Sequence, residues 1–90
     1  GPSEGSEKFY MDNTSAIVVT GTTKVSKVTV EARSNSSTKG LEIIAGSYTA
    51  SHKFSTTVTS HSFDITVTSA MGFSLGAAAK SVQIVSLRWE

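Results

Sequence analysis

The chain has 90 residues, a net charge of +1 and no cysteine. This length corresponds to one domain at most, and without cysteine the domain can form neither a disulfide nor a thiolate metal site. The charge gives no electrostatic attraction to nucleic acid or an anionic membrane, and no apolar run is long enough to cross a bilayer. From composition we therefore predict neither nucleic-acid binding nor membrane insertion.

Serine and threonine make up 28 of the 90 residues, whereas charged residues make up only 17%. Threonine is β-branched and suits a pleated strand, so the bias favours an all-β domain with a hydroxyl-rich surface. The low charged fraction is untypical of a cytosolic enzyme, and we predict an extracellular or cell-surface location. Gly1-Pro2 is typical of what a protease leaves after tag removal. We interpret residues 1–8 as such a remnant plus a linker, and residues 9–90 as one β-sandwich domain.

The first half of the chain contains three predicted strands. Ala16–Thr20 is a short apolar run. Lys24–Arg33 alternates apolar and polar residues with a period of two, as a half-buried strand does. A polar loop over Ser34–Gly40 precedes a third strand at Leu41–Ala45.

The second half is less regular. Weak alternation predicts a fourth strand at Lys53–Val58 and a turn at Ser60–His61, followed by a clear strand at Phe63–Thr68. Residues 71–80 predict either a short strand at Phe73–Leu75 or one helical turn at Ala77–Ala79.

The last predicted strand, Ser81–Trp89, is apolar on both faces. Val82 and Ile84 share one face, while Val85, Leu87 and Trp89 share the other. This pattern predicts either a central strand or a bulge that switches the register near Ile84.

Five to seven short strands separated by serine- and glycine-rich loops predict a small antiparallel β-sandwich, of jelly-roll or immunoglobulin-like type. The alternating apolar residues predict a core that consists of Val28, Val30, Leu41, Ile43, Phe63, Ile65, Val67, Val82 and Ile84.

Catalytic and cofactor chemistry has little support in the sequence. His61 and Asp64 lie on opposite faces of their predicted strand, and His61 and His52 are expected as exposed turn residues, so we predict no metal site. No Gly-x-Ser-x-Gly elbow occurs, and Gly72–Gly76 lacks the Lys-Ser/Thr ending of a phosphate loop. We therefore predict no enzyme and no cofactor.

Aromatic side chains are the best candidates for a ligand surface. Carbohydrate-binding sandwiches stack sugar rings on exposed tryptophan and tyrosine, with polar groups around them. Trp89, its neighbour Arg88, Tyr48 and Tyr10 are the predicted ligand-binding residues. The alternative interpretation of Trp89 is that its ring caps the core.

The strands Ser62–Thr68 and Ser81–Trp89, with a variable loop between them, resemble the jelly-roll accessory modules of bacterial extracellular nucleases, glycosidases and surface proteins. The resemblance covers residues 16–89 and departs from the pattern at Thr49–Thr59. Immunoglobulin-like surface modules and phage tail-fibre or baseplate domains fit the strand pattern almost as well. Fold analogy of this kind says little about the ligand.

Two functions follow from these observations. The first is a non-catalytic binding module of a larger extracellular or surface protein, with polysaccharide or glycan as the leading ligand class. The second is a structural or assembly domain, such as a spacer, a fibre segment or a virion component. This second function predicts contacts with neighbouring domains, or self-association through a strand edge.

Overall fold

A computed structural model gives the fold of the chain and describes residues 3–5, 9–11, 16–20, 24–34, 39–67, 71–77 and 82–90. In these ranges the chain forms the strands β1 (Ser3–Gly5), β2 (Phe9–Met11), β3 (Ala16–Thr20), β4 (Lys27–Ser34), β5 (Lys39–Ala45), β6 (Tyr48–Phe54), β7 (Thr59–Asp64), β8 (Gly72–Ala77) and β9 (Val82–Trp89).

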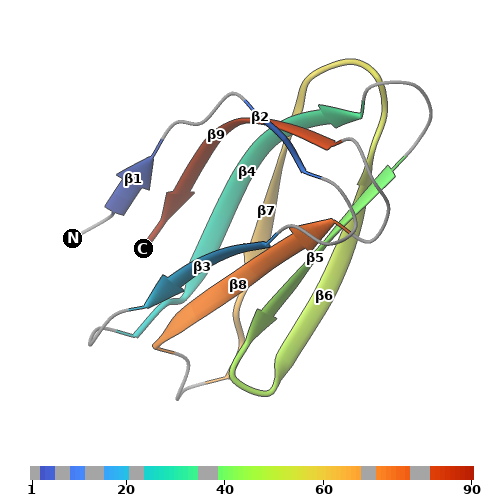
Figure 1. Cartoon of the computed structure of the whole chain (residues 1–90). Helices are drawn as coiled ribbons and strands as arrows, with labels where there is room; N and C mark the ends of the chain where they lie inside the picture. The colour runs from blue at the N-terminus through green and yellow to red at the C-terminus, as the bar shows by residue number, and fades with distance from the viewer. Residues whose placement is uncertain are drawn as a thin grey trace.

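The strands form two antiparallel sheets that face each other as two layers (Figure 1). Sheet A has the order β1-β9-β4-β7, with β2 also paired to β9, and sheet B has the order β3-β8-β5-β6. These sheets confirm the predicted all-β sandwich. Between residues 16 and 89 the structure describes the strands β3 to β9, which fall within the predicted range of five to seven.

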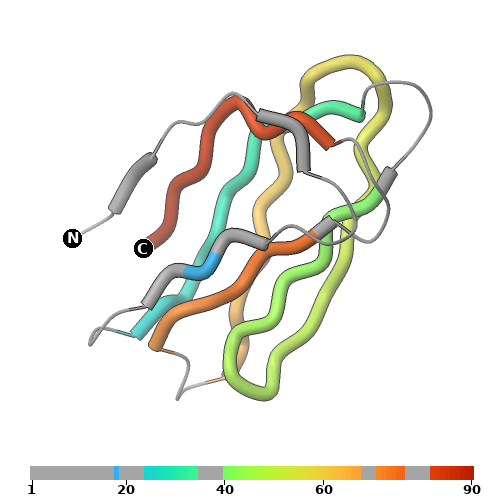
Figure 2. The backbone as a smooth tube through the Cα atoms, viewed as in Figure 1, coloured from blue at the N-terminus to red at the C-terminus, as the bar shows by residue number. Residues whose placement is uncertain are grey.

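The strand order distinguishes between the two predicted sandwich types. Strand β2 pairs with β9, β3 with β8, β4 with β7 and β5 with β6, so the first half of the chain pairs in reverse order with the second. The path is that of a long hairpin wrapped into two sheets, as the tube in Figure 2 shows. This is the jelly-roll arrangement. An immunoglobulin-type sandwich forms one of its sheets from strands A, B, E and D, so that its strands A and B are in the same sheet. Here the successive strands β2, β3, β4 and β5 alternate between sheets A and B.

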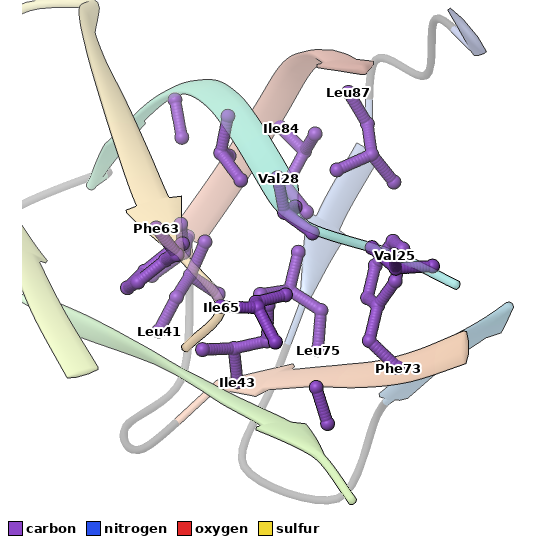
Figure 3. Packing of buried hydrophobic residues seen from close by; sticks show 14 of the residues in the cluster. Val25, Val28, Leu41, Ile43, Phe63, Ile65, Phe73, Leu75, Ile84 and Leu87 are labelled. Atoms are coloured by element: carbon purple, nitrogen blue, oxygen red, sulfur yellow. The ribbon is translucent and has the colours of Figure 1, made fainter. Parts of the chain in front are cut away.

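The core lies between the sheets and consists of apolar side chains from both (Figure 3). Eight of the nine predicted core residues are buried, namely Val28, Val30, Leu41, Ile43, Phe63, Ile65, Val82 and Ile84. Val67, the ninth, is partly buried and packs against this cluster. Phe54 and Phe73 are also buried and belong to the same core cluster.

Strand β9 explains why the last segment is apolar on both faces. It lies inside sheet A, between β4 on one side and β1 and β2 on the other. Its pairing with β4 shifts where Glu31 faces Ser86 but Ala32 faces Ile84, which leaves Val85 as an extra residue. This bulge returns Leu87 to the core side, on which Ile84 already lies. Both the central position and the predicted register switch are therefore present.

The prediction for residues 48–61 was wrong. Gly46, with φ of 62°, turns the chain tightly after β5, so that β6 begins at Tyr48. The change of direction then falls at residues 55–58, where a strand was expected, and Ser60–His61 lie within β7. Glycine adopts this positive φ without steric cost, which permits a two-residue hairpin connection.

Two other segments also bear on the sequence predictions. Ser3–Gly5, within the segment interpreted as a tag remnant and linker, pairs with β9 as strand β1. The predicted strand at Phe73–Leu75 is confirmed as part of β8, which runs to Ala77. The alternative helical turn extends into residues 78–80, which lie outside the described part of the chain.

Candidate functional site

Two of the predicted ligand-binding residues, Trp89 and Tyr48, pack against the core from different sheets. Trp89 is half-buried and packs against the core, with its ring in edge contact with Phe73 at 5.6 Å between centroids. Tyr48 is also partly buried against the core, but it belongs to the other sheet. The structure therefore places Trp89 as its alternative interpretation predicts, as a ring that caps the core.

Arg88 and Tyr10 lie elsewhere. Because alternate residues of a strand point to opposite faces, Arg88 points away from the core that its neighbour Trp89 contacts, and it is exposed opposite Thr29. Tyr10 faces Gln83 in the pairing of β2 with β9, and its side chain lies outside the described residues. The ligand-binding role of these residues stays a prediction.

The outer face of sheet A carries a row of hydrogen-bonded polar side chains. The Ser86 hydroxyl donates to the Glu31 carboxylate at 2.7 Å. The hydroxyls of Thr29 and Ser62 are 3.0 Å apart, and Arg33 Nε donates to the Gln83 side-chain oxygen at 2.9 Å. We call these side chains, together with Arg88, the polar face: Thr29, Glu31, Arg33, Ser62, Gln83, Ser86 and Arg88. The polar face presents hydroxyl, carboxylate and guanidinium groups on a β-sheet surface.

A second cluster joins the two sheets where β6 lies next to β7. The rings of His52 and His61 stack face to face, with centroids 3.6 Å apart and planes 10° from parallel. Each histidine also makes an edge contact with the phenylalanine two residues along its strand. His52 and Phe54 are 4.8 Å apart, and His61 and Phe63 are 4.7 Å apart. We call these four rings the ring stack.

The ring stack corrects the expectation of two exposed turn histidines. Both histidines are half-buried, and both lie within strands. The error follows from placing the turn at Ser60–His61, because the true turn at residues 55–58 brings β6 and β7 together. The pattern His-x-Phe occurs at residues 52–54 and again at 61–63. This repeat was the sequence signal that could have revealed the ring stack.

The electrostatics of the ring stack disfavour a proton on His61. Partial burial lowers the pKa of His61, and a positive charge on His52 lowers it further, while the Asp64 carboxylate acts in the opposite direction. Burial and like charge both oppose the charged form of an imidazole. His61 therefore favours its neutral state more than an ordinary surface histidine does.

The stacked geometry is unsuited to a shared metal ion. A metal lies about 2.0–2.1 Å from a histidine nitrogen, close to the plane of the ring, and one ion cannot lie in two parallel planes 3.6 Å apart. Asp64 is exposed and lies on the opposite face of β7 from His61. Among the described residues no group of three histidine, cysteine or carboxylate side chains could hold a metal ion.

The two sheets differ in how their edges are built. Strands β3 and β6 are the edges of sheet B, and β7 is an edge of sheet A. Strand β6 includes Lys53, and β7 includes Asp64. Strand β3 reads Ala-Ile-Val-Val-Thr and has no charged residue, and its Val18 side chain is 66% exposed. Charges on an edge strand discourage pairing with another chain, and β3 has no such protection.

These features define the chain as a small jelly-roll sandwich with a polar outer face and an uncharged edge strand. It also has a contact between β6 and β7 through His52 and His61, which we call the seam. No protein-family model and no curated protein sequence matches the chain. In the part of the chain that the structure describes, no helix is long and apolar enough to cross a membrane.

Proposed function

We propose that this chain is a non-catalytic assembly domain that acts through protein–protein contacts at the edge strand β3. The observation that carries the proposal is the combination of edge position, five uncharged residues and the exposed Val18 side chain. An edge strand presents unpaired backbone N–H and C=O groups, which another extended strand can satisfy. A sandwich with a charge-free edge of this kind is suited to pairing with a second copy or a neighbouring domain.

The aromatic residues give further support to an assembly role. A sugar-binding surface needs rings that remain exposed for stacking. Trp89 and Tyr48 instead pack partly buried against the core, where they stabilise the sandwich itself. Among the described residues, the surface offers the backbone edge of β3 and the hydroxyl, carboxylate and guanidinium groups of the polar face, which suit contacts with other protein elements.

The experiment compares wild type with Val18→Lys by sedimentation over a range of concentrations. We expect wild type to self-associate and Val18→Lys to remain monomeric, because a lysine on the edge strand opposes pairing. Ile44→Lys is the matched control. Ile44 is also apolar and exposed on sheet B, but it lies in the interior strand β5, so this variant should associate as wild type does.

Two results would contradict the proposal. One is a wild-type protein that stays monomeric at millimolar concentration and does not bind its neighbouring domains. The other is equal loss of association in both lysine variants, which would assign the contact to the outer sheet surface instead of the edge.

Carbohydrate binding is a second candidate function, and the polar face is the observation that favours it. Arg88 is exposed beside Thr29, whose hydroxyl lies next to that of Ser62. Sugar hydroxyls bind well to convergent polar groups of this kind. A glycan array and a polysaccharide pull-down test this function, with Arg88→Ala as the variant and Lys24→Ala as the control for loss of an exposed cation. A blank result in both assays would remove carbohydrate as the ligand class.

A further inference from the structure

The ring stack occupies the place where the chain passes from one sheet to the other. Strand β6 is an edge strand of sheet B, and β7 is an edge strand of sheet A. Residues 55–58 connect these two strands along the yellow loop in Figure 1. The backbone N–H of Ser34 in β4 donates to the Ser55 carbonyl at 2.8 Å, which fixes one end of this connection to sheet A. Beyond the connection, the two strands belong to different sheets and do not pair with each other. Side-chain contacts must therefore hold them together.

The contacts that hold this seam are largely aromatic. His52 and His61 meet face to face at 3.6 Å, and Phe54 and Phe63 contact their edges. The two phenylalanines extend into the core, where both are buried, while both histidines are only half-buried. Water and protons can therefore reach the imidazoles, although the rings help to close the sandwich.

Stacking of this kind depends on protonation. Two neutral imidazoles stack favourably, whereas a proton on either ring adds a charge that burial disfavours. Protons on both rings place two like charges about 3.6 Å apart, at a distance where repulsion is strong in a partly desolvated site. The same contact is therefore attractive at neutral pH and repulsive when both rings are charged.

Few compensating charges face the histidines. On β4, Val30 lies opposite His61, and on β5, Leu41 lies opposite His52, and both of these residues are fully buried. Among the side chains that the structure describes on these four strands, the charged ones next to the seam point away from the core: Lys53, Glu42, Glu31 and Asp64. Lys39 of β5 lies opposite Phe54 in the register, and its side chain is outside the described ones. Asp64 is the carboxylate that acts on His61, and it favours the charged form, but it is exposed and its effect is smaller than that of burial. Among the described residues, Asp64 is therefore the carboxylate that offsets an added proton on His61, and it offsets it only in part.

We propose that the ring stack is a pH-sensitive clasp, which holds β6 against β7 at neutral pH and releases them in mild acid. Release separates the two sheet edges without breaking the apolar core between β4, β9, β5 and β8. The clasp is a property of the fold itself and does not depend on the assembly role proposed for β3.

The direction of the pH effect follows from linkage. An unperturbed histidine titrates at about pH 6.5, and the pKa of His61 in the folded protein is lowered. Below about pH 6.5 the unfolded chain therefore binds more protons than the folded one. The free energy of unfolding then decreases as the pH is lowered, until the pH is below the lowered pKa of His61 in the folded protein. Above about pH 6.5 the contribution of His61 to stability is fully present.

The first experiment measures the thermal unfolding midpoint of wild type and His61→Phe between about pH 8 and about pH 5. Phenylalanine keeps an aromatic ring in the stack but cannot take up a proton. We expect the wild-type Tm to fall by about 4–8 °C more than that of His61→Phe over this range. The carboxylates are common to both proteins, so their own contribution cancels in the difference. Equal losses of Tm in the two proteins would overturn the proposal.

The second experiment uses wild type alone, in case the variant does not fold. Amide hydrogen-exchange protection factors at neutral and acid pH report local opening. We expect protection in β6 and β7 to fall at acid pH by at least tenfold, while protection in β4 and β9 is retained. A uniform loss over all four strands, or no loss in β6 and β7, would show that the seam does not open selectively and would overturn the clasp.

Discussion

The centre of the sandwich and its β6–β7 seam close the same gap between the same two sheets with different chemistry. At the centre, Leu41, Leu75 and Ile84 are completely buried aliphatic side chains. At the seam, the rings of His52 and His61 stack while half-exposed to solvent. Aliphatic burial is non-directional and contains nothing that titrates, whereas imidazole stacking changes sign with protonation. The comparison shows how one small fold can join a pH-independent core to a pH-dependent edge.

Truncation at the centre gives the largest effect that separates the two regions. Ile84→Ala removes a fully buried side chain from the interior strand β9, and we expect a loss of about 2–5 kcal/mol in the free energy of unfolding. The loss should be the same at neutral and at mildly acid pH, because no titratable group is involved. Urea denaturation at the two pH values measures it. If the loss in the free energy of unfolding depended on pH, the centre and the seam would be energetically coupled, and the contrast between them would not hold.

The contact between Trp89 and Phe73 is an aromatic contact without a histidine, so it serves as a comparison for the seam. We expect Trp89→Ala to cost about 3 kcal/mol, at the low end for loss of a large aromatic ring because Trp89 is only half-buried. Trp89→Phe keeps an edge contact and should cost less, about 1 kcal/mol. Acrylamide quenching of the Trp89 fluorescence should be weaker than in the unfolded chain. Free quenching together with a negligible cost in Trp89→Ala would instead favour an exposed ligand platform.

Ser34 is a buried polar side chain in an otherwise apolar interior, and its substitution has the smallest expected effect on stability. Its side chain is completely buried at the end of β4, and its hydroxyl has no hydrogen-bond partner among the described residues. An unsatisfied buried polar group costs free energy, so Ser34→Ala should be neutral or stabilising by up to about 1 kcal/mol. Thermal unfolding measures the change, with Ser51→Ala, at an exposed serine of β6, as a control for simple loss of a hydroxyl. A clear destabilisation by Ser34→Ala would reveal a polar requirement at this position.

The strands with the most regular alternation were predicted best. Lys24–Arg33 shows a period of two, and its apolar residues are buried as predicted. In the predicted strand Phe63–Thr68 the alternation also placed Phe63 and Ile65 correctly in the core, but the strand bounds were wrong, because β7 ends at Asp64. The last strand was predicted because two apolar phases on one strand require either burial on both faces or a register change. The structure has a central strand that also contains a bulge at Val85. In these places the local pattern and the tertiary structure impose the same constraint.

The segment from Tyr48 to His61 could not be predicted in the same way. Its burial alternates weakly, because β6 is an edge strand with half-buried residues on its inner side. Phe54 and Val58 suggested one strand, but Phe54 ends β6 and Val58 lies in the connection between sheets. The ring stack then depends on two strands from different sheets, and neither strand alone specifies that their histidines meet.

The sequence by itself determined the all-β class and the apolar faces of the main strands, because both follow from side-chain alternation within one strand. For β9 the same alternation left two alternatives, a central position or a bulge. Only the tertiary structure decided the jelly-roll order, the place of Trp89 against Phe73 and the stack of His52 on His61. These features depend on which distant strands pair and which edges face each other. Alternation within a strand sets which face is buried, but it does not set the neighbour that covers it.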